Sequence, residues 1–219
     1  MKTQNFLICL VGLPSSGKSV FAKKLKIALE KRFNTLDTKI IDPDKIRQKI
    51  NPDKFDYEKE HIVRNENLRR IKEELEKGSI IISDDLNYYS SMRHDLRDIT
   101  TNLKLNFFII YISTPPEICI KWNEERGEPI PNTLITKIND KFDKFGKYNW
   151  DIPDATYDLS QITNPFQVIE DLLDQLIKKM QILGIESRKK KIENKSSNLD
   201  NENLDKITRI YVGDLLHKT

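Results

Sequence analysis

The chain has 219 residues, 37 of them basic and 34 acidic, and its net charge of +3 argues neither for nor against a nucleic-acid partner. This length can bury one good core with a small appendage. The longest apolar runs are too short to span a membrane and no signal segment opens the chain, so we expect a cytoplasmic protein with no membrane partner.

The first predicted element is a buried strand over residues 6–11, and it leads into a phosphate-binding loop. The loop fits the pattern G-x-x-x-x-G-K-[ST] at every fixed position, and a helical pattern follows it. Its residues, all expected to bind the nucleotide, are Gly12, Leu13, Pro14, Ser15, Ser16, Gly17, Lys18 and Ser19. We expect Lys18 to reach the β- and γ-phosphates of ATP and Ser19 to ligate Mg²⁺.

Strands and helices alternate along the rest of the chain. Strands are predicted over 38–41, 79–83, 106–112 and 155–159. Helices are predicted over 44–50 and 57–77, from Met92 to Leu103, after Pro115 and Pro116, from Leu134 to Phe145, and from Ile169 to Met180. This alternation predicts an α/β fold of the P-loop NTPase kind, kinase-like, with a parallel sheet and helices on both faces.

Composition changes near residue 186 and predicts three parts of the chain. Residues 1–185 form the predicted kinase-like domain. Residues 186–203 are polar and lack apolar periodicity, which indicates a linker. Residues 204–219 hint at a short helical tail.

Acidic residues follow two predicted strands at the sheet edge where open α/β sheets bind ligands. Asp84 ends the third strand and is assigned to the Mg²⁺ shell through water, with Asp85 as its neighbour or substitute. Asp44 follows the second strand together with Asp42, and it is the candidate base that deprotonates an acceptor hydroxyl. The alternative for Asp44, compatible with that role, is to cap the following helix.

Residues 122–131 run from the end of a predicted helix into a segment that contains Gly and Pro, a pattern typical of a small lid. Arg126 is its candidate phosphate contact, and the alternative is a surface arginine at a helix end. Arg93 and Arg97 are weaker candidates, expected at the surface. Cys9 and Cys119 are predicted to be small buried side chains and not a disulfide or a metal pair, and the three histidines are scattered.

Together these motifs resemble the archaeal O-phosphoseryl-tRNA(Sec) kinase (L-seryl-tRNA(Sec) kinase) family. The residues that carry the resemblance are 12–19, 44–47, 84–93, 125–131 and 148–153, with D-D-x-N-Y-Y-x-S-M-R over 84–93 the most specific. The resemblance implies transfer of the ATP γ-phosphate to the serine of seryl-tRNA(Sec), the step that precedes selenocysteine synthesis. It implies tRNA as the partner, with residues 204–219 as a possible start of a tRNA-binding module. It also implies Lys18 and Ser19 holding ATP and Mg²⁺, Asp44 as base and Arg126 as phosphate contact.

One position favours a sister family. The kinases carry a pair of arginines on the lid helix; Arg126 matches the second, but Trp122 occupies the position of the first. A Trp-Asn pair there resembles the Elongator-associated regulatory ATPases of wobble-uridine tRNA modification. For the Trp122 ring itself we expect core packing, because the apolar Ile118 lies one turn before it. A tRNA-stimulated ATPase therefore stays the alternative to a kinase, and a nucleotide-binding protein with another acceptor is a third reading.

Overall fold

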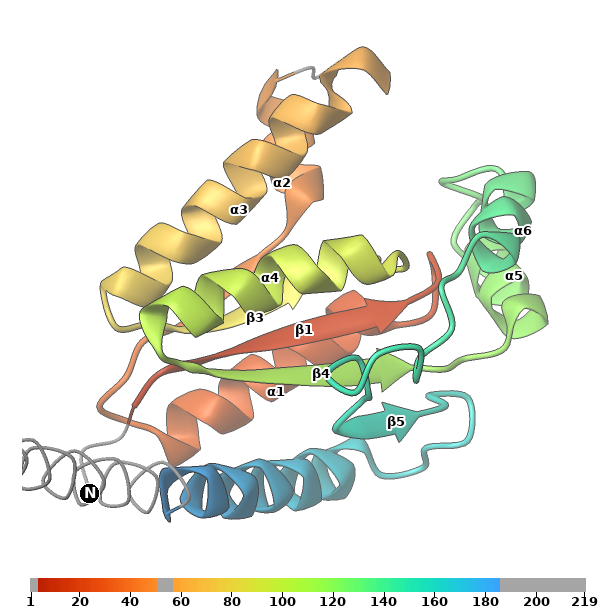
Figure 1. Cartoon of the computed structure of the whole chain (residues 1–219). Helices are drawn as coiled ribbons and strands as arrows, with labels where there is room; N and C mark the ends of the chain where they lie inside the picture. The colour runs from red at the N-terminus through yellow and green to blue at the C-terminus, as the bar shows by residue number, and fades with distance from the viewer. Residues whose placement is uncertain (1–3, 51–56, 186–219) are drawn as a thin grey trace, which may run out of the picture. The chain divides into compact units, whose positions relative to one another are not determined.

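The computed structural model describes residues 4–50 and 57–185 and contains a five-stranded sheet (Figure 1). The strands are β1 (Phe6–Gly12), β2 (Thr38–Ile41), β3 (Ile80–Asp84), β4 (Asn106–Ile112) and β5 (Ala155–Tyr157). They lie in the order β2-β3-β1-β4-β5, and every neighbouring pair is parallel. The predicted fold class is confirmed, because all five carboxyl ends meet at one edge of the sheet.

Helices cover both faces of the sheet (Figure 1). Their bounds are α1 (Lys18–Arg32), α2 (Pro43–Ile50), α3 (Glu60–Glu76), α4 (Ser90–Leu103), α5 (Pro116–Glu125) and α6 (Asn132–Asp140), with a 3₁₀ turn η1 (Tyr57–Lys59) before α3. Helices α3 and α4 lie on one face. Helix α1 lies on the other, where Arg32 pairs with Glu170 at 3.1 Å and with Asp174 at 2.8 Å on a helix that begins at residue 165.

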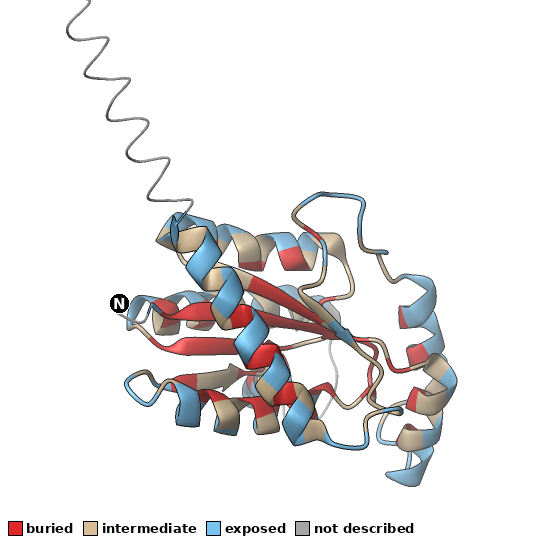
Figure 2. Ribbon diagram, turned by 90° about the horizontal axis from the view of Figure 1, so that it is seen from below, coloured by how far each residue is buried: buried red, intermediate tan, exposed pale blue. Residues whose placement is uncertain are grey.

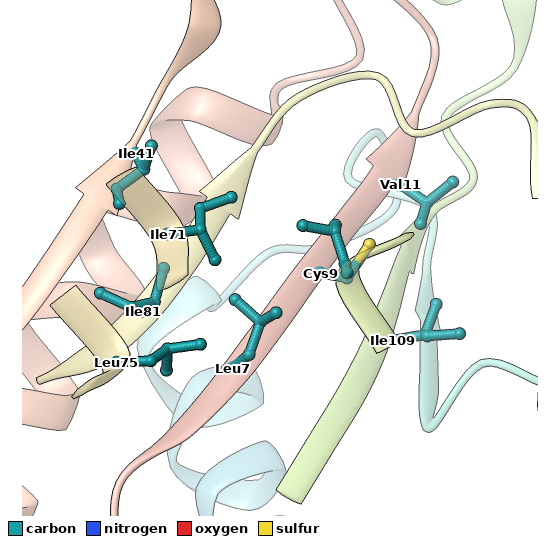
Figure 3. Packing of buried hydrophobic residues seen from close by; sticks show 9 residues of the cluster. Leu7, Cys9, Val11, Ile41, Ile71, Leu75, Ile81 and Ile109 are labelled. Atoms are coloured by element: carbon teal, nitrogen blue, oxygen red, sulfur yellow. The ribbon is translucent and has the colours of Figure 1, made fainter. Parts of the chain in front are cut away.

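The core lies on both sides of β1, whose residues are all buried. Alternate residues of a strand point to opposite faces. Leu7, Cys9 and Val11 pack on the face of α3 and α4 with Ile71, Leu75, Leu96 and other apolar side chains (Figure 3). Phe6 meets Phe33 and Phe108 edge to face. Figure 2 shows the buried residues concentrated in the strands and along one side of each helix.

Two predicted helices differ from the observed ones. The helix predicted from Leu134 to Phe145 ends at Asp140, because Phe142 and Phe145 turn away to pack on Tyr111 of β4, at ring distances of 5.6 and 5.0 Å. The helix predicted over 57–77 is divided into η1 and α3. The spacing of apolar residues along the sequence does not distinguish the buried face of a helix from a loop whose apolar side chains pack on the same sheet.

The predicted boundary at residue 186 stays a prediction. The chain divides by its internal contacts into units Met1–Asp174 and Gln175–Thr219, and of the second unit the structure describes residues 175–185, which are helical. The predicted linker and tail lie outside the described residues. Within 4–50 and 57–185, no helix is both long and apolar enough to cross a membrane.

Candidate functional site

The phosphate loop joins the end of β1 to the start of α1, and two glycines are required by its geometry. A Cβ on Gly12 would lie 2.6 Å from the carbonyl oxygen of Ile112 on β4. Gly17 has a φ of 92°, and a Cβ there would lie 2.8 Å from Leu159. The contact at Gly12 is with a backbone atom and excludes a larger residue, whereas at Gly17 the Leu159 methyl group can move and it is the positive φ that favours glycine.

Lys18 is buried at the first position of α1 and folds back over the loop. Its Nζ donates to the carbonyl oxygens of Gly12 at 3.0 Å and Leu13 at 2.6 Å. Burial lowers the pKa of Lys18 to about 8, while the nearby Asp84 and Asp85 raise it in part. The ammonium group is therefore held inside the loop, where nucleotide phosphates would replace the carbonyl oxygens as its partners.

Ser19, in the first turn of α1, lies beside Asp84, the last residue of β3. Asp84 is buried, which raises the pKa of its carboxyl group, and an interaction with the Ser19 hydroxyl lowers that pKa in part. A nearby cation would stabilise the charged form of this buried carboxylate. A hydroxyl and a carboxylate fit Mg²⁺, which keeps several water ligands in nucleotide sites. Asp85 accepts the backbone N–H of Leu86 at 2.7 Å, and burial raises its pKa as well.

The acids after β2 have separate structural roles. Asp42 accepts the backbone N–H of Asp44 at 2.9 Å, so Asp42, and not Asp44, caps α2. The side chain of Asp44 is 74% exposed and pairs with Arg47 one turn on. Arg47 is also bound to Glu60 of α3, at 2.6 and 2.8 Å. Arg47 is therefore held between carboxylates of α2 and α3, and Asp44 is an accessible carboxylate at the sheet edge.

Arg126 lies against the phosphate loop just after α5. Its Nη2 donates to Ser15 Oγ at 2.6 Å, and its Nε donates to the carbonyl oxygen of Trp122 at 3.2 Å. Ser15 in turn donates to Asn123 at 3.3 Å. The one lid arginine that matches the kinase pattern is thus within reach of a phosphate bound in the loop, as a phosphate contact requires.

A cavity of about 400 Å³ opens beside the loop, between α1 and α5. Its walls include Phe21, Trp122, Leu159 and Ile162, with Lys24 and Arg126 at the polar positions. Core packing was the expectation for Trp122, but its half-buried ring lines this cavity. An apolar, aromatic cavity next to a phosphate loop suits the base and ribose of a nucleotide.

Arg93 is not at the surface, as its charge had predicted, but completely buried. It forms two hydrogen bonds of 2.6 Å with Asp151, itself completely buried, and donates to the carbonyl oxygens of Asn87, Tyr88 and Asp143. Its guanidinium also lies 4.5 Å from the centre of the Phe145 ring. Arg93, the last residue of the motif over 84–93, therefore holds the segment before β5 against α4. The charge pattern of the sequence did not reveal this structural role.

Three buried polar residues position the loop, a role that the sequence analysis did not assign to them, although Asn87 and Asn123 belong to motifs that carry the family resemblances. Thr114 donates to the carbonyl oxygen of Ser16 at 3.0 Å. Asn87 donates to the carbonyl oxygen of Leu10 at 2.8 Å. Asn123, fully buried, donates to the carbonyl oxygen of Ile130 and so closes the lid segment. Thr114 and Asn87 follow β4 and β3 at the carboxyl edge; that position was the signal for Thr114, and Asn87 was also a fixed position of the motif over 84–93.

The prediction of two small, buried cysteine side chains agrees with the structure. Cys9 and Cys119 are both free and buried. Burial raises the pKa of both thiols, that of Cys119 to about 11. Among the residues that the structure describes, no cluster of His, Cys, Asp and Glu could hold a metal ion without further ligands.

We predict that ATP affinity falls as the pH rises above about 8. Bound phosphates raise the pKa of Lys18 above its value of about 8 in the free protein. The affinity for ATP is therefore highest below about pH 8, where Lys18 is charged in both states, and it declines as the pH rises toward the higher pKa of the complex. Calorimetric titration with a non-hydrolysable ATP analogue over about pH 7.5–9.5 measures this. Lys18→Arg, which stays charged, is the control; an equal decline in that variant would contradict the assignment.

Comparison with known proteins places the chain in a family. A family model described as chromatin associated protein KTI12 matches residues 6–219. The L-seryl-tRNA(Sec) kinase of Methanococcus maripaludis is 37% identical over 212 residues, which cover 96% of this chain and 80% of the kinase. Protein kti12 of Schizosaccharomyces pombe is 29% identical over 161 residues, 67% of this chain and 55% of that protein. The chain thus spans about half the length of this yeast relative.

Solved structures agree with the fold. Chaetomium thermophilum Kti12 in complex with ADP-AlF3 superposes with a TM-score of 0.63 at 21% identity, over 77% of this chain and 98% of that one. The Mycobacterium tuberculosis APS kinase CysC in complex with AMPPNP and APS gives 0.57 at 19% identity, over 79% and 98%. The chain therefore belongs to the KTI12 family and is a P-loop kinase or ATPase homologous to L-seryl-tRNA(Sec) kinase.

Proposed function

We propose that this protein transfers the γ-phosphate of ATP to the serine hydroxyl of seryl-tRNA(Sec). The observation that carries the proposal is the open position of Asp44. The aromatic cavity lies beside α1 and α5, whereas Asp44 follows β2, the strand at the opposite edge of the sheet. A nucleotide in the cavity would extend its phosphates across Lys18 and Ser19 toward β3, which leaves the side of Asp44 for the acceptor.

The reaction follows from these positions. Asp44 takes the proton of the serine hydroxyl, the serine oxygen forms a bond to the γ-phosphorus, and the bond from that phosphorus to the oxygen of ADP breaks. Lys18 and Arg126 balance the charge of the transferred group. Ser19 and Asp84 would hold Mg²⁺, which neutralises charge on the β- and γ-phosphates when bound. The 37% identity to an L-seryl-tRNA(Sec) kinase across most of both chains supports this acceptor.

A second candidate is a tRNA-stimulated ATPase of the KTI12 kind that acts in wobble-uridine tRNA modification. It is favoured by the family match and by Trp122, which lies in the cavity wall at the position of the first lid arginine of the kinases. Loss of one cation near the transferred phosphate lowers the rate of phosphoryl transfer. Water, as a small acceptor, would need no site beyond Asp44.

Labelled ATP distinguishes the two functions. The protein is incubated with γ-labelled ATP and seryl-tRNA(Sec), and the RNA is then digested with ribonuclease. We expect the label on phosphoseryl-adenosine. Free phosphate alone, released faster when tRNA is added, would contradict the kinase and support the ATPase. Uncharged tRNA(Sec) is the control, because it offers the same RNA without the serine hydroxyl.

A further inference from the structure

A second cavity of about 350 Å³ lies outside the nucleotide site. It is formed by the first turns of α4 and by the segment between α6 and β5. Its lining residues are Ser90, Ser91, His94, Asp95, Tyr148 and Trp150. The cavity is therefore bounded by aromatic rings on one side and by groups that form hydrogen bonds on the other.

The aromatic wall is a stacked pair of rings. Tyr148 and Trp150 lie with ring centres 5.7 Å apart and planes 12° from parallel. His94 of α4 meets the Trp150 ring edge to face at 5.2 Å, and the guanidinium of Arg97 lies 5.3 Å from its centre. Trp150 is thus fixed from the side of α4, while Tyr148 stays 41% exposed. A flat, accessible ring on a fixed support is what a stacked base requires.

Internal hydrogen bonds hold this wall in place. Asp151, which follows Trp150, is paired with the buried Arg93. The backbone N–H of Asp151 donates to the carbonyl oxygen of Tyr148 at 2.9 Å, and its carbonyl oxygen accepts the N–H of Gly146 at 3.1 Å. The segment is therefore a tight turn anchored on α4, and binding would cost little ordering of the rings.

The cavity is connected to the edge of the sheet that holds the phosphate loop. Arg93 donates to the carbonyl oxygen of Asn87, and Asn87 donates to Leu10 of β1. The carbonyl oxygen of Leu86 accepts the N–H of Gly12, the first residue of the loop. Ser90, in the cavity wall, follows these residues directly at the carboxyl end of β3. A ligand in the cavity would thus lie beside the first turns of α4, the helix that packs on β1 and β4.

We propose that this cavity binds an unpaired nucleobase of the RNA substrate, namely the terminal base of the tRNA 3′ end. The choice of terminal base rests on the proposed function, because the serine is esterified to the ribose of that nucleotide. Stacking on Tyr148 would bind the base, and Ser91 and His94 would face its polar edge.

The charges around the cavity favour RNA over a protein side chain. Lys141, Lys144 and Lys147 are exposed on the same segment, and Lys147 lies 5.4 Å from the centre of the Tyr148 ring. Arg97 adds a cation above Trp150. Of the carboxylates nearby, Asp95 pairs with Arg64 and Asp98 with His94, while Asp143 accepts hydrogen bonds from the backbone N–H and the hydroxyl of Ser90. Exposed lysines beside stacked rings match a chain of alternating phosphates and bases.

The test measures binding without phosphoryl transfer. The full chain, saturated with a non-hydrolysable ATP analogue, is titrated with a labelled single-stranded RNA that ends in CCA, and fluorescence anisotropy is recorded. Tyr148→Ala is expected to weaken binding about 5- to 100-fold. Tyr148→Phe, which keeps the ring, and Ile152→Ala, an exposed apolar neighbour, should keep the wild-type affinity. An RNA whose last nucleotide lacks its base should bind wild type as weakly as intact RNA binds Tyr148→Ala.

Wild-type affinity in Tyr148→Ala, or equal binding of the intact and baseless RNAs, would overturn the proposal. Because Tyr148 is exposed, its loss should not unfold the chain, and Trp150→Phe provides a second variant that retains stacking. In the kinase assay, Tyr148→Ala should raise KM for seryl-tRNA with little change in kcat. Base-dependent RNA binding with no phosphoserine product would contradict the proposed function alone, and normal product with an unchanged KM would contradict the cavity alone.

Discussion

Asp44→Asn is expected to reduce phosphoserine formation about 10²- to 10⁴-fold while ATP affinity stays close to that of wild type. Asparagine has nearly the shape of aspartate but cannot take the proton of the serine hydroxyl. The side chain of Asp44 is exposed at the sheet edge, and its pairing with Arg47 would be exchanged for an amide contact at the surface. Quench-flow measurement of phosphoserine and calorimetric titration of the ATP analogue separate the two effects.

Asp42→Asn is the matched control, because it lies two residues away and its amide oxygen can still cap α2. Burial raises the pKa of Asp42, so it is the rival acid for the role of base. Retained turnover in Asp44→Asn together with a loss in Asp42→Asn would transfer the role to Asp42. In an ATPase that needs no serine, the same Asp44→Asn change would lower the release of free phosphate instead.

The place of the loop between β1 and α1 could be predicted from the sequence because the requirements of the pattern are local. Gly12 and Gly17 are set by backbone geometry and close packing, and Lys18 and Ser19 by the chemistry of phosphate and magnesium. The parallel sheet followed from alternating apolar runs, because a strand buried on both faces has a nearly continuous apolar sequence. Asp84 was located by its place at the end of such a run.

Contacts between distant segments could not be predicted in the same way. Arg93 and Asp151 are 58 residues apart, and each looks like a surface charge in its own sequence context. Phe142 and Phe145 continued the helical spacing of α6, but their partner Tyr111 is on another element. Trp122 had an apolar neighbour one turn away, which favoured the core, whereas the cavity it lines depends on α1 and on residues near Leu159. Tertiary packing decided each of these positions.

Asp151→Ala is expected to destabilise the fold by about 3–5 kcal/mol. The substitution leaves the charge of Arg93 buried, with only backbone carbonyl oxygens as hydrogen-bond partners. This loss of unfolding free energy comes from leaving one buried charge unpaired. It is larger than the net contribution of the intact ion pair to the stability of the native state. Urea unfolding followed by circular dichroism measures the change. Glu76→Gln, which removes an exposed ion pair with Lys72, is the control and should cost less than about 1 kcal/mol.

A double-mutant cycle tests whether the two charges act as a pair. Arg93→Met combined with Asp151→Ala should cost less than the sum of the single changes, because removal of both charges leaves none of them unpaired. Simple addition of the two costs would contradict the coupling. Asp151→Asn, which keeps a hydrogen bond to Arg93, serves where Asp151→Ala does not fold. Because Asp151 also anchors Tyr148 and Trp150, Asp151→Asn should weaken RNA binding more than ATP binding, which links the stability of this ion pair to the proposed RNA-binding cavity.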